Sequence, residues 1–291
     1  MRKPYPTDLS DEEWRYLEPY VPGPKYHGWP RIHCPREILN AVFYLLKSGC
    51  PWRLLPHEFP PWKTVFHYFR QWRIDGTWER MNRAIRERLR ARSKRNSQPS
   101  AGIVDSQSIK TTGVGGEERG YDRAKNIRGR KRHLLVDTED FVLKANIHSA
   151  KLIDQEGIQL LLEHAGETFP RLSHLWLDAG YRGEAKGKGW VEKALGWSVE
   201  LVERPRKPAP EEVLMNWAAE WAKEGKALDW RKLVPPRGFQ VLPRRWVVER
   251  SFAWICHNRR MSKDYERLCA TSEAFVYVAM TRLMVRRLVR V

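Results

Sequence analysis

The chain has 291 residues, and its 53 Lys and Arg against 35 Asp and Glu give a formal net charge of +18. A chain of this length folds as one large domain or two modest ones, and such an excess of cations is usually neutralised by nucleic acid, with a merely soluble basic protein and an acidic membrane surface as the alternatives. Because the sequence has no apolar run near the roughly 20 residues of a membrane span, no signal peptide and no CxxC pair, we expect a cytoplasmic, nucleoid-associated protein without a membrane anchor, zinc ribbon or redox motif.

The first 92 residues are predicted to form an all-helical domain. Ser10-Asp11-Glu12-Glu13 has the pattern of a capping box, in which Ser10 is the N-cap and Glu13 reaches back to its amide. Apolar residues at helical spacing predict three further helices, over 36–47, 62–72 and 77–93.

Two of these helices could form a helix-turn-helix reader of DNA. In that arrangement the helix over 62–72 lies in a groove, where its Lys63 and Arg70 contact the DNA. The connection over 49–61 is longer than the usual three or four residues of the motif, so a plain helical bundle is about as well supported. The many cations on and after these helices favour the DNA-binding interpretation.

Residues 93–100 are polar and without periodicity, and we interpret them as a linker to a second domain over 101–291. The predicted strands of that domain are Ala101–Ser106, His133–Thr138, Phe141–Ile147, Leu175–Leu177 and Ser198–Val202. The predicted helices are Asp154–His164, a helical insertion near 206–240, and Arg244–Asn258. Three antiparallel strands, a helix, a parallel strand, a helix and a last strand make a mixed α/β sheet flanked by helices.

Three acidic residues stand out in this basic chain: Asp105 after Ile-Val, Asp178 after Leu-Trp-Leu, and Glu249 on the last predicted helix. The two aspartates lie on or at the end of predicted strands, where α/β sheets commonly place ligands. Taken singly, each acid is better explained by a structural ion pair or a turn. Together they supply the hard oxygen ligands that Mg²⁺ prefers, so we predict that they form a catalytic metal site.

The neighbourhoods of these acids resemble those of DDE transposases of bacterial insertion sequences, in particular the insertion sequence five family. The first is Asp-Ser-Gln followed by Lys-Thr-Thr, and the second is Leu-Asp-Ala-Gly-Tyr. The third and most specific is Arg-Arg-Trp-Val-Val-Glu-Arg-Ser-Phe-Ala-Trp, followed by Asn-Arg-Arg and Lys-Asp-Tyr-Glu. The resemblance covers nearly the whole chain, including the N-terminal segment Gly-Cys-Pro-Trp-Arg-Leu-Leu-Pro.

The resemblance implies an RNase H-like catalytic core in which Asp105, Asp178 and Glu249 bind two Mg²⁺ ions, or Mn²⁺ in their place. It implies a transposase that binds double-stranded DNA at the terminal inverted repeats of an insertion sequence, cleaves it, and joins the freed 3′-OH to target DNA. A homodimer or larger synaptic assembly would bring two ends together. The alternatives are an RNase H-like DNA nuclease without strand transfer and a non-catalytic, domesticated DNA-binding protein.

Basic residues near the first aspartate are the predicted phosphate contacts. The stretch over 119–133 is rich in Arg and Lys, which favours a DNA-binding surface over an ordinary solvated loop. The candidates around the first aspartate are Lys110, Arg128, Arg130, Lys131 and Arg132.

The resemblance adds further DNA-binding candidates around the glutamate helix. Arg245, four residues before Glu249, matches the arginine of the family's glutamate helix. A tyrosine and a lysine of the wider signature are replaced here by Leu242 and Cys256. The residues expected to take over their DNA-positioning roles are Arg259, Arg260 and Lys263.

Overall fold

Helices make up the N-terminal part of the protein. The computed structural model describes residues 2–23, 32–114, 116–202, 211–223, 225 and 243–290. The N-terminal helices are α1 (Asp11–Leu17), α2 (Pro35–Ser48), α3 (Trp62–Ile74) and α4 (Thr77–Arg92), joined in part by the 3-10 turns η1 (Glu18–Tyr20) and η2 (Trp52–Leu54). The predicted capping box starts α1: Ser10 Oγ accepts a hydrogen bond from the Glu13 amide at 3.2 Å, and the Glu13 carboxylate accepts one from the Ser10 amide at 3.1 Å.

A mixed sheet follows the helices. Its strands are β1 (Ala101–Lys110), β2 (Gly120–Asp122), β3 (Ile127–Asp137), β4 (Val142–Ser149), β5 (His174–Asp178) and β6 (Ser198–Val202). β3 pairs antiparallel with β1, β2 and β4, and β5 and β6 continue the sheet parallel to β1. This is the predicted mixed α/β order, with the helical region preceding it, and it forms the RNase H-like fold.

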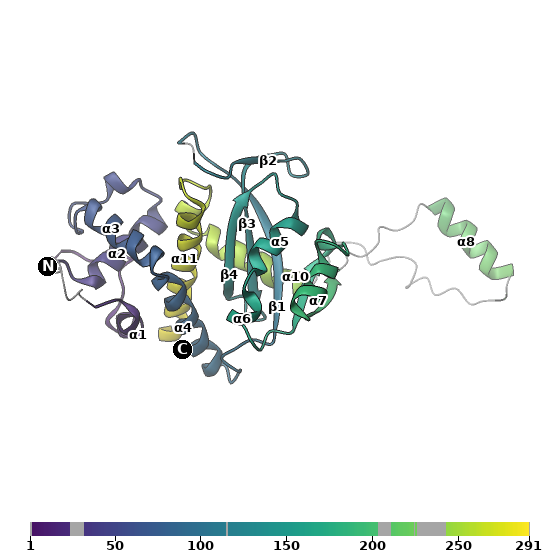
Figure 1. The fold of residues 1–291 in the computed structure, drawn as a ribbon, viewed down its shortest axis with the longest axis horizontal. Coiled ribbons are helices and arrows are strands. Elements are labelled where there is room, and N and C mark those ends of the chain that lie inside the picture. Colours follow the sequence, from purple (N-terminus) through teal and green to yellow (C-terminus); the bar gives the residue numbers. More distant parts are fainter. Residues whose placement is uncertain are drawn as a thin grey trace.

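Helices cover both faces of this sheet (Figure 1). On one face lie α5 (Asp154–Leu162), α6 (Ala165–Thr168) and α7 (Lys188–Leu195). On the other lie α10 (Pro243–Cys256) and α11 (Cys269–Arg290), and α4 packs against α11. No helix within the described residues is long and apolar enough to cross a lipid bilayer.

Side chains alternate between the two faces along each strand. Ile103, Leu134 and Val136 belong to the core beneath α10 and α11, whereas their neighbours Val104 and Leu135 belong to the core beneath α5 and α7. The strands are therefore buried on both sides, and a residue's position along a strand fixes which helices it meets.

The N-terminal helices and α11 share a hydrophobic core. Phe275 of α11 stacks on Phe69 of α3, with ring centroids 4.6 Å apart. Arg90 of α4 pairs at 2.7 Å with Asp137 at the end of β3, and both side chains are buried. The predicted boundary over 93–100 thus joins two regions that pack closely, and the division into domains stays a prediction.

Three regions differ from what the sequence predicts. Strand β2 and the part of β3 before His133 lie where no strand is predicted. No element is predicted over 269–290, where the structure forms α11. Because every residue from Ala274 to Arg282 is buried, this helix lacks the polar face that makes an amphipathic helix recognisable in a sequence. Of the helical insertion predicted near 206–240, the described part is α8 (Glu211–Lys223) and Gly225, and α8 lies apart from the sheet (Figure 1). The remaining residues of that insertion lie outside the described residues.

Candidate active site

Asp105 and Asp178 lie side by side on neighbouring strands. β1 and β5 run parallel, and Val104 pairs with Leu177, so the next residues along the two strands are the two aspartates. β1 is central in the sheet, between β3 and β5. The structure therefore brings together two acids that are 73 positions apart in the sequence.

Asp105 faces helix α10. The next residue, Ser106, points to the opposite face, where its hydroxyl donates to Asp154 at the start of α5 at 2.7 Å. One residue further, Gln107 Oε1 lies 3.7 Å from the Sγ of Cys256 on α10. Because side chains alternate along a strand, Asp105 shares the face of Gln107.

Asp178 faces the same helix. Trp176, two residues earlier on β5, lies against α10, with the Arg244 guanidinium 4.3 Å from its ring centroid. Asp178 shares this face by the same alternation. The two aspartates are thus presented to the helix that carries Glu249.

Arg245 links Glu249 to the aspartates. Its Nε lies 2.9 Å from Glu249 Oε1, one turn further along α10, and its Nη1 lies 3.6 Å from Asp178 Oδ2. Within the described part of the chain, no three His, Cys, Asp or Glu side chains are grouped closely enough to hold a metal ion. In this arrangement one guanidinium balances two of the three acids.

The setting of Asp105 disfavours its ionised form. Burial raises the pKa of Asp105 to about 7; the hydrogen bond from the Ser106 amide, at 2.7 Å, acts against this, and the charge of Asp178 adds to it. A nearby carboxylate disfavours ionisation of Asp105, and a bound cation would favour it. The chemistry of this donor set, two strand carboxylates with a third on the facing helix, fits a hard divalent cation such as Mg²⁺.

A buried chain of hydrogen bonds fixes the turn that follows Asp178. Tyr181 OH lies 2.8 Å from His133 Nε2, His133 Nδ1 lies 2.7 Å from His148 Nε2, and His148 Nδ1 lies 2.9 Å from the Ser149 carbonyl oxygen. Because a carbonyl oxygen only accepts, His148 donates to it, His133 donates to His148, and Tyr181 donates to His133. Burial lowers the pKa of both histidines and raises that of Tyr181, so all three side chains are neutral at pH 7.

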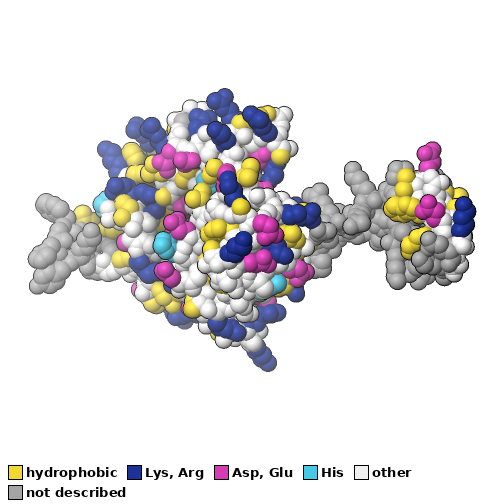
Figure 2. Space-filling model, turned by 45° about the vertical axis from the view of Figure 1, so that its right-hand side comes forward, with side chains coloured by type: hydrophobic (Ala, Val, Ile, Leu, Met, Phe, Trp, Pro, Cys, Tyr) yellow, Lys and Arg dark blue, Asp and Glu magenta, His cyan; other side chains and the backbone are white. Residues whose placement is uncertain are grey.

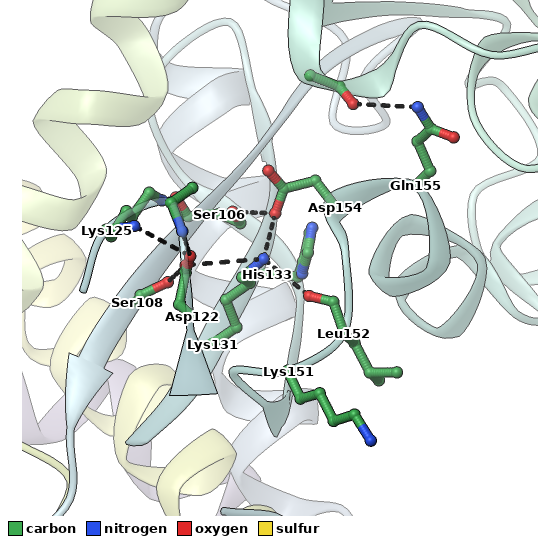
Figure 3. Close-up of polar contacts among 12 residues, drawn as sticks. Ser106, Ser108, Asp122, Lys125, Lys131, His133, Lys151, Leu152, Asp154 and Gln155 are labelled. Carbon is green, nitrogen blue, oxygen red and sulfur yellow. Dashed lines mark hydrogen bonds and ion pairs between the residues drawn. The ribbon is translucent and has the colours of Figure 1, made fainter. Parts of the chain in front are cut away.

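Helix α5 passes this chain of hydrogen bonds at a glycine. A Cβ on Gly157 would lie 2.3 Å from His133 Cε1 and 2.6 Å from His148 Nε2, closer than nonbonded atoms can approach. The close passage brings Asp154, at the start of α5, to Lys131 and Ser106 (Figure 3). Lys131 Nζ lies 2.9 Å from Asp154 Oδ1 and donates to the Leu152 carbonyl oxygen at 2.8 Å.

The residues that support the turn after Asp178 are not among those predicted from the sequence. Tyr181 lies within the Leu-Asp-Ala-Gly-Tyr motif, so its position three residues after Asp178 is a sequence feature that could indicate a role beside that aspartate. The roles of His133 and Asp154 have no local signal, because they depend on the pairing of β3 with its neighbours and on the passage of α5.

The predicted DNA contacts form an exposed group, a buried group and the partly buried Arg245. The exposed group is Lys63, Arg70, Lys110, Arg128, Arg259 and Lys263. Arg245 is partly buried between two acids, Cys256 lies beside Gln107, and Leu242 is outside the described residues. The buried group is Arg130, Lys131, Arg132 and Arg260.

The members of the buried group have partners inside the protein, so the structure does not present them on an exposed surface. Lys131 is held by Asp154, as described above. Arg130 pairs with Asp264 at 3.2 Å, Arg132 donates to the Met261 carbonyl oxygen at 2.8 Å, and Arg260 pairs with Glu266 at 2.6 Å. β3 is covered on both faces, although its run of basic residues would suggest an exposed strand.

Comparisons with known proteins agree with this architecture. Residues 96–284 match the family described as "Transposase DDE domain", and residues 9–82 match the family described as "Putative transposase of IS4/5 family". The chain is 32% identical over 117 residues to the "Insertion element IS402 uncharacterized 16.2 kDa protein" of Burkholderia cepacia. That match covers 37% of this chain and 76% of the relative. No solved structure matches the chain significantly.

Proposed function

The chain belongs to the DDE transposases of insertion sequences, and from this premise we propose that it binds the terminal inverted repeats of an insertion sequence and catalyses metal-dependent DNA cleavage and strand transfer. The observation that carries the proposal is the placement of Asp105 and Asp178 side by side, facing the helix of Glu249. Acids in such a group repel phosphate, so their presence in a DNA-binding chain is best explained by chemistry that needs them.

We propose that Asp105, Asp178 and Glu249 hold two Mg²⁺ ions, or Mn²⁺ in their place. When bound, such ions activate the attacking oxygen and stabilise the leaving oxygen of a phosphodiester. The chain's own residues position the acids: the parallel strands align the aspartates, and the hydrogen bond of Tyr181 to His133 holds the turn after Asp178. Arg245 is placed to bind a DNA phosphate once another cation balances the acids.

Exposed cations are proposed to guide the DNA to this site. Figure 2 shows Lys and Arg side chains gathered toward the top of the body, where Figure 1 places β2. Lys110 ends β1, the strand of Asp105, and Arg128 lies near the start of β3, the strand paired with β1. The remaining proposed contacts are Lys63 and Arg70 on α3, and Arg259 and Lys263 after α10. Joining two element ends requires both to be held at once, so we propose that the protein works as a homodimer or larger assembly.

A strand-transfer assay tests the proposal. The purified protein is incubated with labelled DNA carrying the ends of its own element, a supercoiled target plasmid and Mg²⁺. Wild type is expected to yield cleaved and joined products, and Asp105→Asn is expected to lose both by at least about 100-fold, since metal ions contribute several kcal/mol to such steps. Glu192→Gln, an exposed acid paired with Lys188 on α7, is the matched control and is expected to keep full activity.

The outcomes separate the alternatives. Cleavage without joined products, lost in Asp105→Asn, identifies a nuclease without strand transfer. DNA binding with no metal-dependent cleavage in wild type identifies a non-catalytic DNA-binding protein. Equal activity of wild type and Asp105→Asn removes this residue from the catalytic site.

A further inference from the structure

A cleft of about 890 Å³ opens on the α5 side of the sheet, next to the turn that follows Asp178. One wall is the end of β2 and the turn to β3, with Tyr121, Arg123 and Lys125. The other wall is the loop between β4 and α5, with Lys151 and Ile153. None of these five residues is one of the three acids proposed to bind metal.

The cleft reaches the proposed catalytic acids. Gly180 lines it, and the amide of Gly180 donates to Asp178 at 2.8 Å. Lys125 Nζ donates to the carbonyl oxygen of Ser106 at 3.3 Å, and Ser106 directly follows Asp105. A DNA strand whose phosphodiester lies at the acids therefore has the cleft next to it.

The acidic residues of the cleft are already balanced by internal donors. Asp122 accepts hydrogen bonds from the Ser108 hydroxyl and from two backbone amides, and Asp154 accepts them from Lys131 and Ser106. Burial alone would raise the pKa of both carboxyls, but the hydrogen bonds outweigh it and lower the pKa. Both acids are thus ionised but paired.

Two cations of the cleft are free. The side chains of Arg123 and Lys151 are exposed and form no ion pair or hydrogen bond with any described residue, and Lys151 points away from the other side chains drawn in Figure 3. With the acids balanced, these cations leave the cleft with a positive charge that an anionic ligand would neutralise.

The rim of the cleft also offers apolar surface. Tyr121 is 48% exposed and Ile153 is 51% exposed, and the Tyr121 hydroxyl is hydrogen-bonded to Asn126. An aromatic ring beside unpaired cations is the combination that binds single-stranded nucleic acid, with bases stacked on the ring and phosphates on the cations. A cleft of about 890 Å³ has the size of a pocket for a small ligand and accommodates groups the size of a nucleotide.

We propose that this cleft binds unpaired nucleotides of the DNA strand that lies at the acids, with Arg123 and Lys151 on the phosphates and Tyr121 stacked on a base. The inference rests on the proposed function for its ligand, because that function places a DNA strand at Asp105 and Asp178. It adds a specific requirement: single-stranded DNA next to the reacting phosphodiester contributes to binding.

Fluorescence anisotropy with two DNAs tests the cleft. One is a blunt duplex and the other is the same duplex with a short single-stranded overhang, both in EDTA so that no chemistry occurs. Wild type is expected to bind the overhang DNA more tightly. Arg123→Ala combined with Lys151→Ala is expected to abolish this preference and to reduce the salt slope on overhang DNA by about 1.4, since each single-strand phosphate contact contributes about 0.7.

Substitutions of the tyrosine test the stacking. Tyr121→Ala is expected to weaken overhang binding about tenfold and to leave blunt-duplex binding unchanged, while Tyr121→Phe keeps the ring and the affinity. Lys193→Ala, an exposed lysine on α7 outside the cleft, is the matched control. Equal weakening on both DNAs, or no weakening beyond the control, overturns the proposal.

Failure of the cleft and failure of the proposed function are distinguishable. If Asp105→Asn keeps the overhang preference while wild type shows no metal-dependent cleavage, the function fails and the cleft stands. If wild type cleaves and joins DNA but the variants bind both DNAs as wild type does, the cleft proposal fails alone.

Discussion

Two regions of the molecule contain the same types of charged residue but partner them differently. One is the acid site, meaning Asp105, Asp178 and Glu249 with the neighbouring cleft. The other is the interface between the sheet and the segment before α11. At the interface, Arg130 pairs with Asp264 and also donates to backbone carbonyl oxygens, and Arg260 pairs with Glu266. These cations are buried and satisfied, so they stabilise the fold.

In the acid site the charged residues have too few partners. Glu249 and Asp178 share Arg245, Asp105 has a raised pKa, and Arg123 and Lys151 have no side-chain partner within the described residues. Total charge therefore does not identify which charged residues of this chain are available to ligands. Charge left without an internal partner does, because it is free to interact with metal ions and phosphates.

The largest expected effect comes from breaking an interface pair. Arg130→Met leaves Asp264 buried without its cation, and losing one partner of a buried pair costs about 3–5 kcal/mol of folding free energy. Urea unfolding followed by circular dichroism measures this cost. Combining Arg130→Met with Asp264→Asn removes the stranded charge and is expected to recover part of the loss. A cost below about 1 kcal/mol for the single variant would contradict the structural role of Arg130.

Local patterns explain how much of the molecule could be predicted from sequence. Helices α2 to α4, strands β1 and β4 to β6, and the second part of β3 follow from apolar spacing, whereas β2 does not. The aspartates of β1 and β5 are recognisable because each follows a short apolar run. The burial of Arg130 and Arg132 could not be predicted, because it depends on helices contributed by distant parts of the chain. The same holds for the contact of His133 with His148, which depends on the register of β3 and β4.

An intermediate effect is expected at a buried acid of α11 that forms no ion pair with the described residues. The Glu273 carboxylate on α11 accepts hydrogen bonds from the Ile147 amide at 2.8 Å and the Asn146 side chain at 3.4 Å, and burial raises its pKa from 4.5 to about 7. The unfolded chain ionises this group near pH 4.5, while the folded protein resists ionisation until about pH 7. Its contribution to stability is therefore full below pH 4.5 and is lost as the pH rises through 7.

Glu273→Gln removes the ionisation and keeps an oxygen for the Ile147 amide. At pH 8 it is expected to stabilise the protein by about 1–3 kcal/mol, and the gain should shrink toward zero as the pH falls to 4.5. Urea titrations at several pH values across this range measure the trend, with Glu192→Gln as an exposed control. A gain that does not depend on pH would show that ionisation of Glu273 is not its source.

The smallest effect on stability, and the sharpest form of the comparison, comes from two arginines on the same strand. Arg128 is exposed and Arg130 is fully buried, although only Gly129 separates them. Arg128→Met is expected to change the folding free energy by less than about 0.5 kcal/mol but to reduce the salt slope of duplex binding by about 0.9, the value for one phosphate contact. Arg130→Met, measured where it is still folded, is expected to leave the salt slope unchanged. Anisotropy titrations at a series of salt concentrations compare the two. If the slopes fall equally, burial does not separate structural from DNA-binding cations in this chain, and the selection of exposed residues as DNA contacts loses its basis.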